Sequence, residues 1–79
     1  MISVKILGTG CKKCLNLEAK VRELISHNGI DAAIEKVTDI NEMMGYGIMM
    51  TPGLVINEQV KSYGIIPKDE QIISWLKEV

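Results

Sequence analysis

The chain has 79 residues, a formal net charge of -1 at pH 7 and 47% hydrophobic residues, which predicts one small domain spanning residues 1–79. Nine Lys and Arg residues against ten Asp and Glu residues exclude the strongly basic surfaces that bind nucleic acids or anionic membranes. The longest uncharged apolar stretch, Met43–Val55, is too short to span a bilayer, and the N-terminus lacks the pattern of a secretory signal. We therefore expect a cytoplasmic monomer that binds neither nucleic acid nor membrane.

The first half of the chain predicts a strand, a helix and a second strand. Apolar and polar residues alternate in Ile2–Leu7, which indicates a strand that ends at Gly8-Thr9-Gly10. Over residues 11–28, apolar side chains at spacings of three and four form one stripe, as on a helix that buries one face: Cys14, Leu17, Val21, Leu24 and Ile25. Gly29 suits the left-handed position after this helix, and Ala32–Val37 is the second predicted strand.

A short second helix is predicted next. Asp39 and Glu42 have the spacing of a capping box, so a helix should begin here and end around Gly45–Gly47. Three of its apolar side chains should face inward: Ile40, Met43 and Met44. Methionines at such spacings usually fill a core, although Met49 and Met50 are also suited to an adaptable apolar rim for protein partners.

The last third of the chain predicts a β-hairpin and a third helix. Leu54–Ile56 and Gln59–Tyr63 are strands joined by a turn at Asn57-Glu58. Pro67 should open a helix with acidic residues in its first turn and with four residues on its inner face: Ile72, Trp75, Leu76 and Val79. The order β-α-β-α-β-β-α predicts an α/β fold, in which a right-handed crossover makes the first two strands parallel and three helices flank a four-stranded mixed sheet.

The two cysteines form the motif Cys11-Lys12-Lys13-Cys14 between the first strand and the first helix. At a helix N-terminus the free N–H groups favour an anion, so the thiol of Cys11 should ionise more easily than a free thiol. Lys12 and Lys13 should lower its pKa further. Cys14 lies on the apolar stripe, where burial disfavours the thiolate.

This asymmetry matches thiol–disulfide exchange. An exposed thiolate attacks a target disulfide, and a second thiol within reach resolves the mixed disulfide. Residues three apart on a first helical turn lie close enough to form a disulfide. We therefore predict that Cys11 is the nucleophile and Cys14 the resolving residue of a reversible dithiol/disulfide pair.

The cysteine motif after the first strand, the Thr51-Pro52-Gly53 turn before an apolar strand, and the hairpin that leads into a Pro-started helix resemble the small thioredoxin/glutaredoxin-like redox proteins. The similarity is to the minimal thioredoxin-like proteins of archaea and bacteria, and it covers nearly the whole chain. It implies a thioredoxin-like fold and a protein disulfide oxidoreductase that reduces disulfides of protein or small-molecule substrates, with no bound cofactor and no metal. The implied partners are disulfide-containing proteins and an electron-donating reductase.

The resemblance also implies site residues beyond the cysteines. It implies that Pro52 is cis and packs beside the cysteines, that the backbone of Thr51 pairs with an extended substrate segment, and that Gly10 and Gly53 belong to the substrate-binding surface. Gly10 and Lys12-Lys13 stand where larger thioredoxins have Trp and Gly-Pro. Substrate preference and reduction potential therefore do not carry over from those proteins.

Two other functions stay open at this point. Two thiolates from Cys11 and Cys14 suit linear Cu(I), and Gly8–Cys11 resembles the metal-binding loop of copper-chaperone domains. Those domains follow the order β-α-β-β-α-β and would need a hairpin where Asp39–Met44 predicts a helix. The other alternative is a non-catalytic interaction domain whose disulfide acts as a switch. Each molecule of a switch would change its redox state once, whereas an enzyme goes through repeated cycles.

Overall fold

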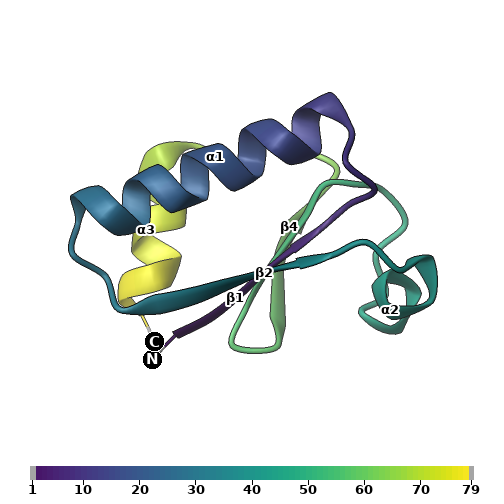
Figure 1. The fold of residues 1–79 in the computed structure, drawn as a ribbon. Helices are drawn as coiled ribbons and strands as arrows, with labels where there is room; N and C mark the ends of the chain where they lie inside the picture. The colour runs from purple at the N-terminus through teal and green to yellow at the C-terminus, as the bar shows by residue number, and fades with distance from the viewer. Residues whose placement is uncertain (1, 79) are drawn as a thin grey trace.

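The computed structural model describes residues 2–78 and has the predicted order of elements (Figure 1). The elements are β1 (Ile2–Leu7), α1 (Lys12–His27), β2 (Ala32–Val37), α2 (Ile40–Gly45), β3 (Gly53–Ile56), β4 (Gln59–Tyr63) and α3 (Asp69–Lys77). Within the described residues, none of these helices has the length and apolar character needed to cross a membrane.

The four strands form one mixed sheet in the order β2-β1-β3-β4. β1 is parallel to β2 and antiparallel to β3, and β3 pairs with β4 as a hairpin. Leu7, the last residue of β1, lies opposite Val37 on one side and Gly53 on the other. The end of β1 therefore brings together the residues that follow β2 and those that precede β3. The predicted α/β class and the parallel pairing of the first two strands are confirmed.

Two apolar clusters lie on opposite faces of the sheet. α1 and α3 cover one face (Figure 1), and the larger cluster lies beneath them: Val4, Ile6, Leu17, Val21, Leu54, Ile56, Ile72 and Leu76. α2 covers one end of the other face, with a smaller cluster: Leu7, Val37, Met43, Ile48 and Val55. The predicted stripe on α1 is confirmed, since Cys14, Leu17 and Val21 are buried.

Two details of the helices differ from the predictions, and a third cannot be compared. Ile40 and Met44 are 62% and 67% exposed, because α2 has only six residues and turns one side chain, Met43, fully into the core. α3 begins at Asp69, after an N-cap at Lys68, and not at Pro67. The prediction for Val79 lies outside the described residues.

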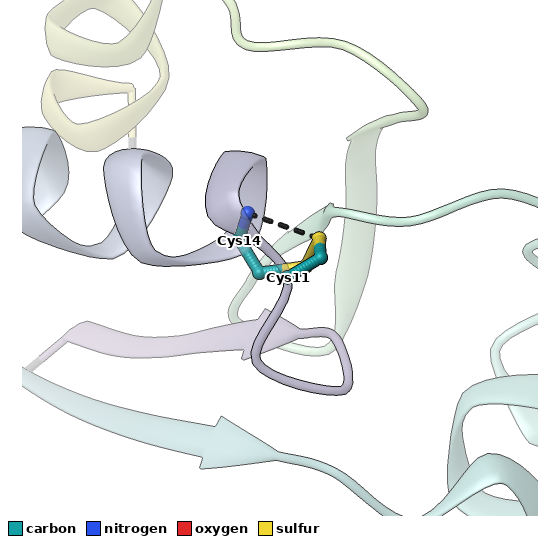
Figure 2. The surroundings of a disulfide bond; sticks show 2 residues. All are labelled: Cys11 and Cys14. Atoms are coloured by element: carbon teal, nitrogen blue, oxygen red, sulfur yellow. Dashed lines mark hydrogen bonds between the residues drawn. A yellow bond between two sulfur atoms is a disulfide. The ribbon is translucent and has the colours of Figure 1, made fainter.

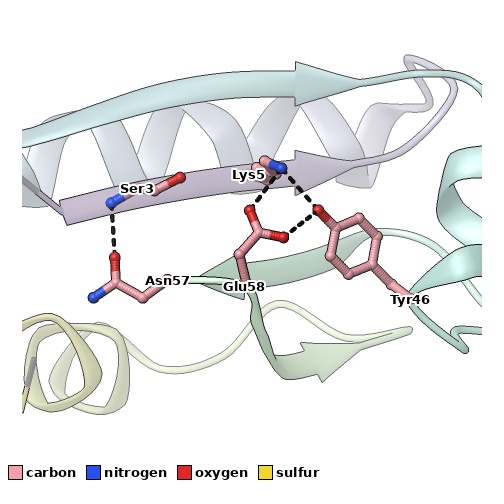
Figure 3. A network of polar contacts seen from close by, with 5 residues as sticks. All are labelled: Ser3, Lys5, Tyr46, Asn57 and Glu58. Carbon is pink, nitrogen blue, oxygen red and sulfur yellow. Dashed lines mark hydrogen bonds and ion pairs between the residues drawn. The ribbon is translucent and has the colours of Figure 1, made fainter.

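A polar network ties α2 to the sheet (Figure 3). The Lys5 ammonium on β1 donates to the Tyr46 hydroxyl at 2.8 Å and forms an ion pair with Glu58 at 2.8 Å. The Tyr46 hydroxyl donates in turn to Glu58 at 2.9 Å. Glu58 comes from the predicted turn, where Asn57 and Glu58 both adopt positive φ angles of 50° and 66°. Tyr46 therefore serves to hold α2 and the hairpin turn against β1.

Candidate active site

Cys11 and Cys14 form a disulfide at the start of α1 (Figure 2). Their Cα atoms are 5.0 Å apart, within the range that a disulfide spans without backbone movement. The spacing of three residues on the first helical turn thus places the two sulfur atoms in bonding reach, as predicted from the sequence.

The two cysteines differ in exposure and in backbone environment. Cys11 is exposed and occupies the N-cap position of α1, with an extended backbone at φ -66° and ψ 165°. The backbone N–H of Cys14 donates to the Cys11 Sγ at 3.3 Å (Figure 2). Cys14 is 5% exposed and belongs to the buried face of the helix. An amide directed at its sulfur favours the thiolate of Cys11, whereas burial disfavours the thiolate of Cys14.

Gly8, the residue after β1, lies directly beneath Cys14. A Cβ on Gly8 would collide with the Cys14 Sγ and would lie 2.9 Å from the Cys14 Cβ. Gly8 is buried, and its backbone N–H donates to the Val37 carbonyl at 2.9 Å. A residue without a side chain is therefore required where the first turn of α1 packs on the end of the sheet. The sequence indicates only a turn at Gly8, and no pattern in it predicts this contact with Cys14.

The segment before β3 lies beside the cysteine loop. Because Gly53 pairs with Leu7, Thr51 and Pro52 extend past the end of β1 toward Thr9 and the cysteines, and Figure 2 shows this strand beginning next to the disulfide. The Thr51–Pro52 peptide bond is cis, as the resemblance implies. Pro52 is buried, and Thr51 is half-buried.

Gly10 and Gly53 take different places in this site. Gly10 is exposed in the cysteine loop with φ 90°, a conformation that favours glycine. Gly53 is buried, and a Cβ there would lie 3.0 Å from Ile48 and 3.3 Å from Leu7. The structure thus gives Gly53 a packing role within the sheet.

Lys12 and Lys13 are exposed in the first turn of α1, which carries no acidic residue. Two cations at the positive end of a helix dipole oppose that dipole. In residues 2–78 neither lysine belongs to any of the ion pairs: Lys5–Glu58, Lys20–Asp69, Arg22–Glu18 and Lys36–Glu18. In the reduced protein, a thiolate at Cys11, the residue before Lys12, would place an anion at this helix end.

A groove of about 420 Å³ opens between α2 and the segment before β3. Its walls are mostly apolar: Thr9, Ile40, Met43, Met44, Ile48, Met49, Met50 and Thr51. Met49 and Met50 are 91% and 60% exposed, so the interpretation of these methionines as core residues is wrong. They belong to an apolar rim that reaches from α2 to Thr51.

A small cavity of about 40 Å³ lies on the other side of Cys14 and includes two charged residues that the sequence analysis missed. Glu18, one helical turn after Cys14, and Lys36, on β2, both line it. The Arg22 guanidinium, and after it the Lys36 ammonium, holds the pKa of Glu18 below its usual value. The four-residue spacing from Cys14 to Glu18 indicates that both lie on the same side of the helix. No feature of the sequence indicates that Lys36, on β2, lies beside them.

The structure brings together Gly10, the cysteine motif and the Thr51-Pro52 segment at one end of the sheet. In residues 2–78 no group of three or more His, Cys, Asp or Glu side chains is arranged to hold a metal ion. The site presents two sulfur atoms, an exposed one bonded to a buried one, beside an apolar groove.

Comparison with known proteins gives a consistent result. Residues 2–77 match the family model described as thioredoxin domain. A protein named thioredoxin from Methanocaldococcus jannaschii is 39% identical over 77 residues, which cover 98% of this chain and 88% of that protein. One from Methanothermobacter thermautotrophicus is 35% identical over 72 residues, which cover 91% of this chain and 94% of that protein. A solved structure described as that of a malarial protein has a TM-score of 0.73 at 13% identity, covering 99% of this chain and 96% of that chain, and shows the fold alone.

Proposed function

As a member of the thioredoxin domain family, this chain is a disulfide oxidoreductase, and we propose that it reduces disulfide bonds of protein substrates in the cytoplasm as a monomer. The single observation that carries the proposal is the bond between an exposed N-cap sulfur and a buried sulfur on the first turn of α1. The exposed sulfur can meet a substrate, and the buried one can reach only its partner.

The proposed reaction has two exchange steps. In the reduced protein the Cys11 thiolate attacks one sulfur of the substrate disulfide, which forms a mixed disulfide and releases the other substrate sulfur as a thiolate. Cys14 then loses its proton, and its thiolate attacks the Cys11 Sγ. The mixed disulfide breaks, the second substrate thiolate leaves, and the Cys11–Cys14 disulfide remains. Two electrons have passed to the substrate, the proton of Cys14 has gone to solvent, and the two substrate thiolates take up protons from solvent.

The electrons are carried by the cysteines, so the cycle requires no bound cofactor. It does require an external dithiol or a reductase, flavin-dependent or other, that returns the oxidised pair to the dithiol. We propose that such a donor meets the same exposed face as the substrate, because Cys14 is covered by Gly8 and the helix.

The segment before β3 is the proposed docking site for an extended substrate. Thr51 precedes the first paired residue of β3, Gly53, and its backbone groups are suited to hydrogen bonds with an added strand. The groove beside it would accept an apolar substrate side chain against Met49 and Met50, whose flexible thioethers adapt to varied shapes. Pro52, which is buried, would fix the path of the backbone at Thr51 in this docking site.

An equilibrium titration tests the proposal. The reduced protein is incubated in dithiothreitol redox buffers without metal, quenched by alkylation and weighed by mass spectrometry. We expect one two-electron transition at about -200 to -300 mV, absent in Cys11→Ser and in Cys14→Ser. Catalytic turnover of a protein disulfide, with dithiothreitol as electron source, must accompany it.

The same measurements separate the alternatives. A protein that forms the disulfide but reduces no substrate beyond one equivalent would be a switch. Cysteines that fail to bridge at any buffer ratio would contradict the redox function and would direct the next experiment to Cu(I) competition.

A further inference from the structure

Lys36 is the one charged residue on the side of β2 that faces α1. Strand residues alternate between faces, and the other residues of β2 on this face are Ala32 and Ile34, which are half-buried against the larger cluster. In the parallel pairing of β1 with β2, Lys36 lies beside Ile6. Gly8, on which Cys14 packs, is two residues further along the same face. Lys36 therefore lies close to Gly8 and to the cysteine that packs on it.

Glu18 reaches the same place from the helix. It follows Cys14 by one turn, about 6 Å along the axis, and so shares the buried face of α1. Its side chain is only 14% exposed. One carboxylate oxygen pairs with the Lys36 Nζ at 3.2 Å, and the other with the Arg22 Nε at 3.0 Å. The ion pair thus joins α1 to β2 just behind Cys14.

Cys14, Glu18 and Lys36 all line one cavity of about 40 Å³, which is large enough for a water molecule. The rest of its lining is uncharged: Ile6, Gly8, Gly10, Leu15 and Thr38. The charged groups on the elements packed around Cys14 include Glu18 and Arg22 on α1, Lys36 on β2, and Lys12 and Lys13 in the first helical turn.

We propose that the Glu18–Lys36 ion pair controls the ionisation of Cys14, with Lys36 favouring the thiolate and Glu18 opposing it. A nearby cation stabilises a thiolate and a nearby anion destabilises it. The inference rests on the proposed function, because it concerns the second exchange step. In that step Cys14 gives its proton to water and attacks Cys11, and the departing substrate thiolate takes a proton from solvent. Lys36 and Glu18 are positioning residues here, since neither touches the reacting sulfur of the substrate.

The test uses Cys11→Ser protein, in which Cys14 is the only thiol. Its ionisation is followed against pH by the ultraviolet absorbance of the thiolate, which needs no access of a reagent to the buried sulfur. Lys36→Gln should move the midpoint to higher pH and Glu18→Gln to lower pH. Each should change the thiolate fraction below the midpoint about threefold, the size of effect expected from one nearby unit charge that solvent largely screens. The double variant should titrate close to the parent.

Lys20→Gln is the matched control, because Lys20 also lies on α1 in an ion pair, with Asp69 at 2.9 Å, but does not line the cavity. It should leave the midpoint unchanged. A merely structural ion pair would shift the midpoints of both variants in the same direction or shift neither, and either outcome would overturn the proposal.

With both cysteines present, Lys36→Gln should slow resolution of the mixed disulfide about threefold at a pH below the midpoint. The titration involves no substrate, so unchanged midpoints would contradict the role of the ion pair and leave the disulfide reductase function unaffected. Absence of turnover with a substrate would contradict the reductase function and leave the titration result unaffected.

Discussion

Cys11 and Cys14 are separated by a single turn of helix, yet their surroundings have opposite effects on ionisation. The N-cap position exposes Cys11 and directs the amide of Cys14 at its sulfur. Cys14, on the inward face of α1, packs against Gly8 and lines the same cavity as Glu18. The roles of nucleophile and resolving thiol follow from these two environments.

Cys14→Ser should trap substrates as mixed disulfides. Without a resolving thiol, the bond between Cys11 and the substrate persists, and non-reducing electrophoresis with mass spectrometry would identify the joined peptides through Cys11. Cys11→Ser is the control and should trap little, because Cys14 is buried. Trapping that occurred only in Cys11→Ser would reverse the assigned roles.

Gly8→Ala should destabilise the oxidised protein by about 1 to 3 kcal/mol, the cost of forcing an added methyl group into a packed site. The new Cβ would collide with the sulfur of Cys14. Denaturant unfolding measures the loss. Gly45→Ala is the control, since its Cβ would meet no atom within 4 Å. Equal stability of Gly8→Ala and the parent would mean that Cys14 does not rest on this glycine.

At the scale of elements, the first turn of α1 combines a helix N-terminus with two exposed lysines and no acid. This combination is electrostatically unfavourable unless an anion is present. The Cys11 thiolate supplies one in the reduced protein. The cost of placing Lys12 and Lys13 here is therefore a reason to expect that they act on the thiol.

Replacing Lys12 and Lys13 together by Gln should raise the pKa of the Cys11 thiol. The rate of alkylation of the reduced protein, measured against pH, would move to higher pH. A double variant of two lysines elsewhere, Lys61→Gln with Lys77→Gln, carries the same change in net charge and should leave the curve in place. Curves that coincide for all three proteins would show that Lys12 and Lys13 do not influence the thiol.

α2 shows how the length of an element changes which residues it buries. Asp39 caps it as predicted, accepting from the Asn41 N–H at 2.8 Å, but six residues cover only one end of the sheet. Met43 enters the core, and Ile40 and Met44 form a wall of the groove. The helical spacing predicted three buried residues, but a helix of this length covers too little of the sheet to bury all three.

For the molecule as a whole, two carboxylates and one lysine link stability to pH. Glu18 is held by Arg22 and then Lys36, and Glu58 by Lys5 and then Tyr46, so both carboxyl pKa values are lowered from the ordinary 4.5. Glu58, and after it Tyr46, raises the pKa of Lys5 above its ordinary 10.5. The carboxylate contributions are present above pH 4.5 and are lost as pH falls through the lowered values. The Lys5 contribution is present below pH 10.5 and is lost as pH rises through the raised value.

Glu58→Gln should therefore be less stable than the parent between these two limits, and the difference should vanish in acid. Unfolding by denaturant over a series of pH values measures it. Glu23→Gln, at an exposed position on α1, is the control and should show no such dependence. A difference between Glu58→Gln and the parent that stayed constant down to the acid limit would contradict the assignment of the network.

The elements, their order and the cysteine pair could be predicted from the amino-acid sequence, because these features depend on spacing along one chain. The alternation of Ile2–Leu7, the stripe on α1 and the turn at Asn57-Glu58 were each predicted within a residue or two of their observed positions. The three-residue spacing of Cys11 and Cys14 was enough to predict a disulfide on the first turn.

The surroundings of the two cysteines could not be predicted in this way, because they are formed by separate elements of the fold. Gly8 meets Cys14, Lys36 meets Glu18, and Thr9 shares a groove with Met49 through contacts between separate elements. These contacts depend on strand register, on the packing of α1 on the sheet and on the shortness of α2. Residues that are distant in the chain acquire charge and steric partners only when the sheet assembles, and no periodicity in the sequence encodes which partner each one meets.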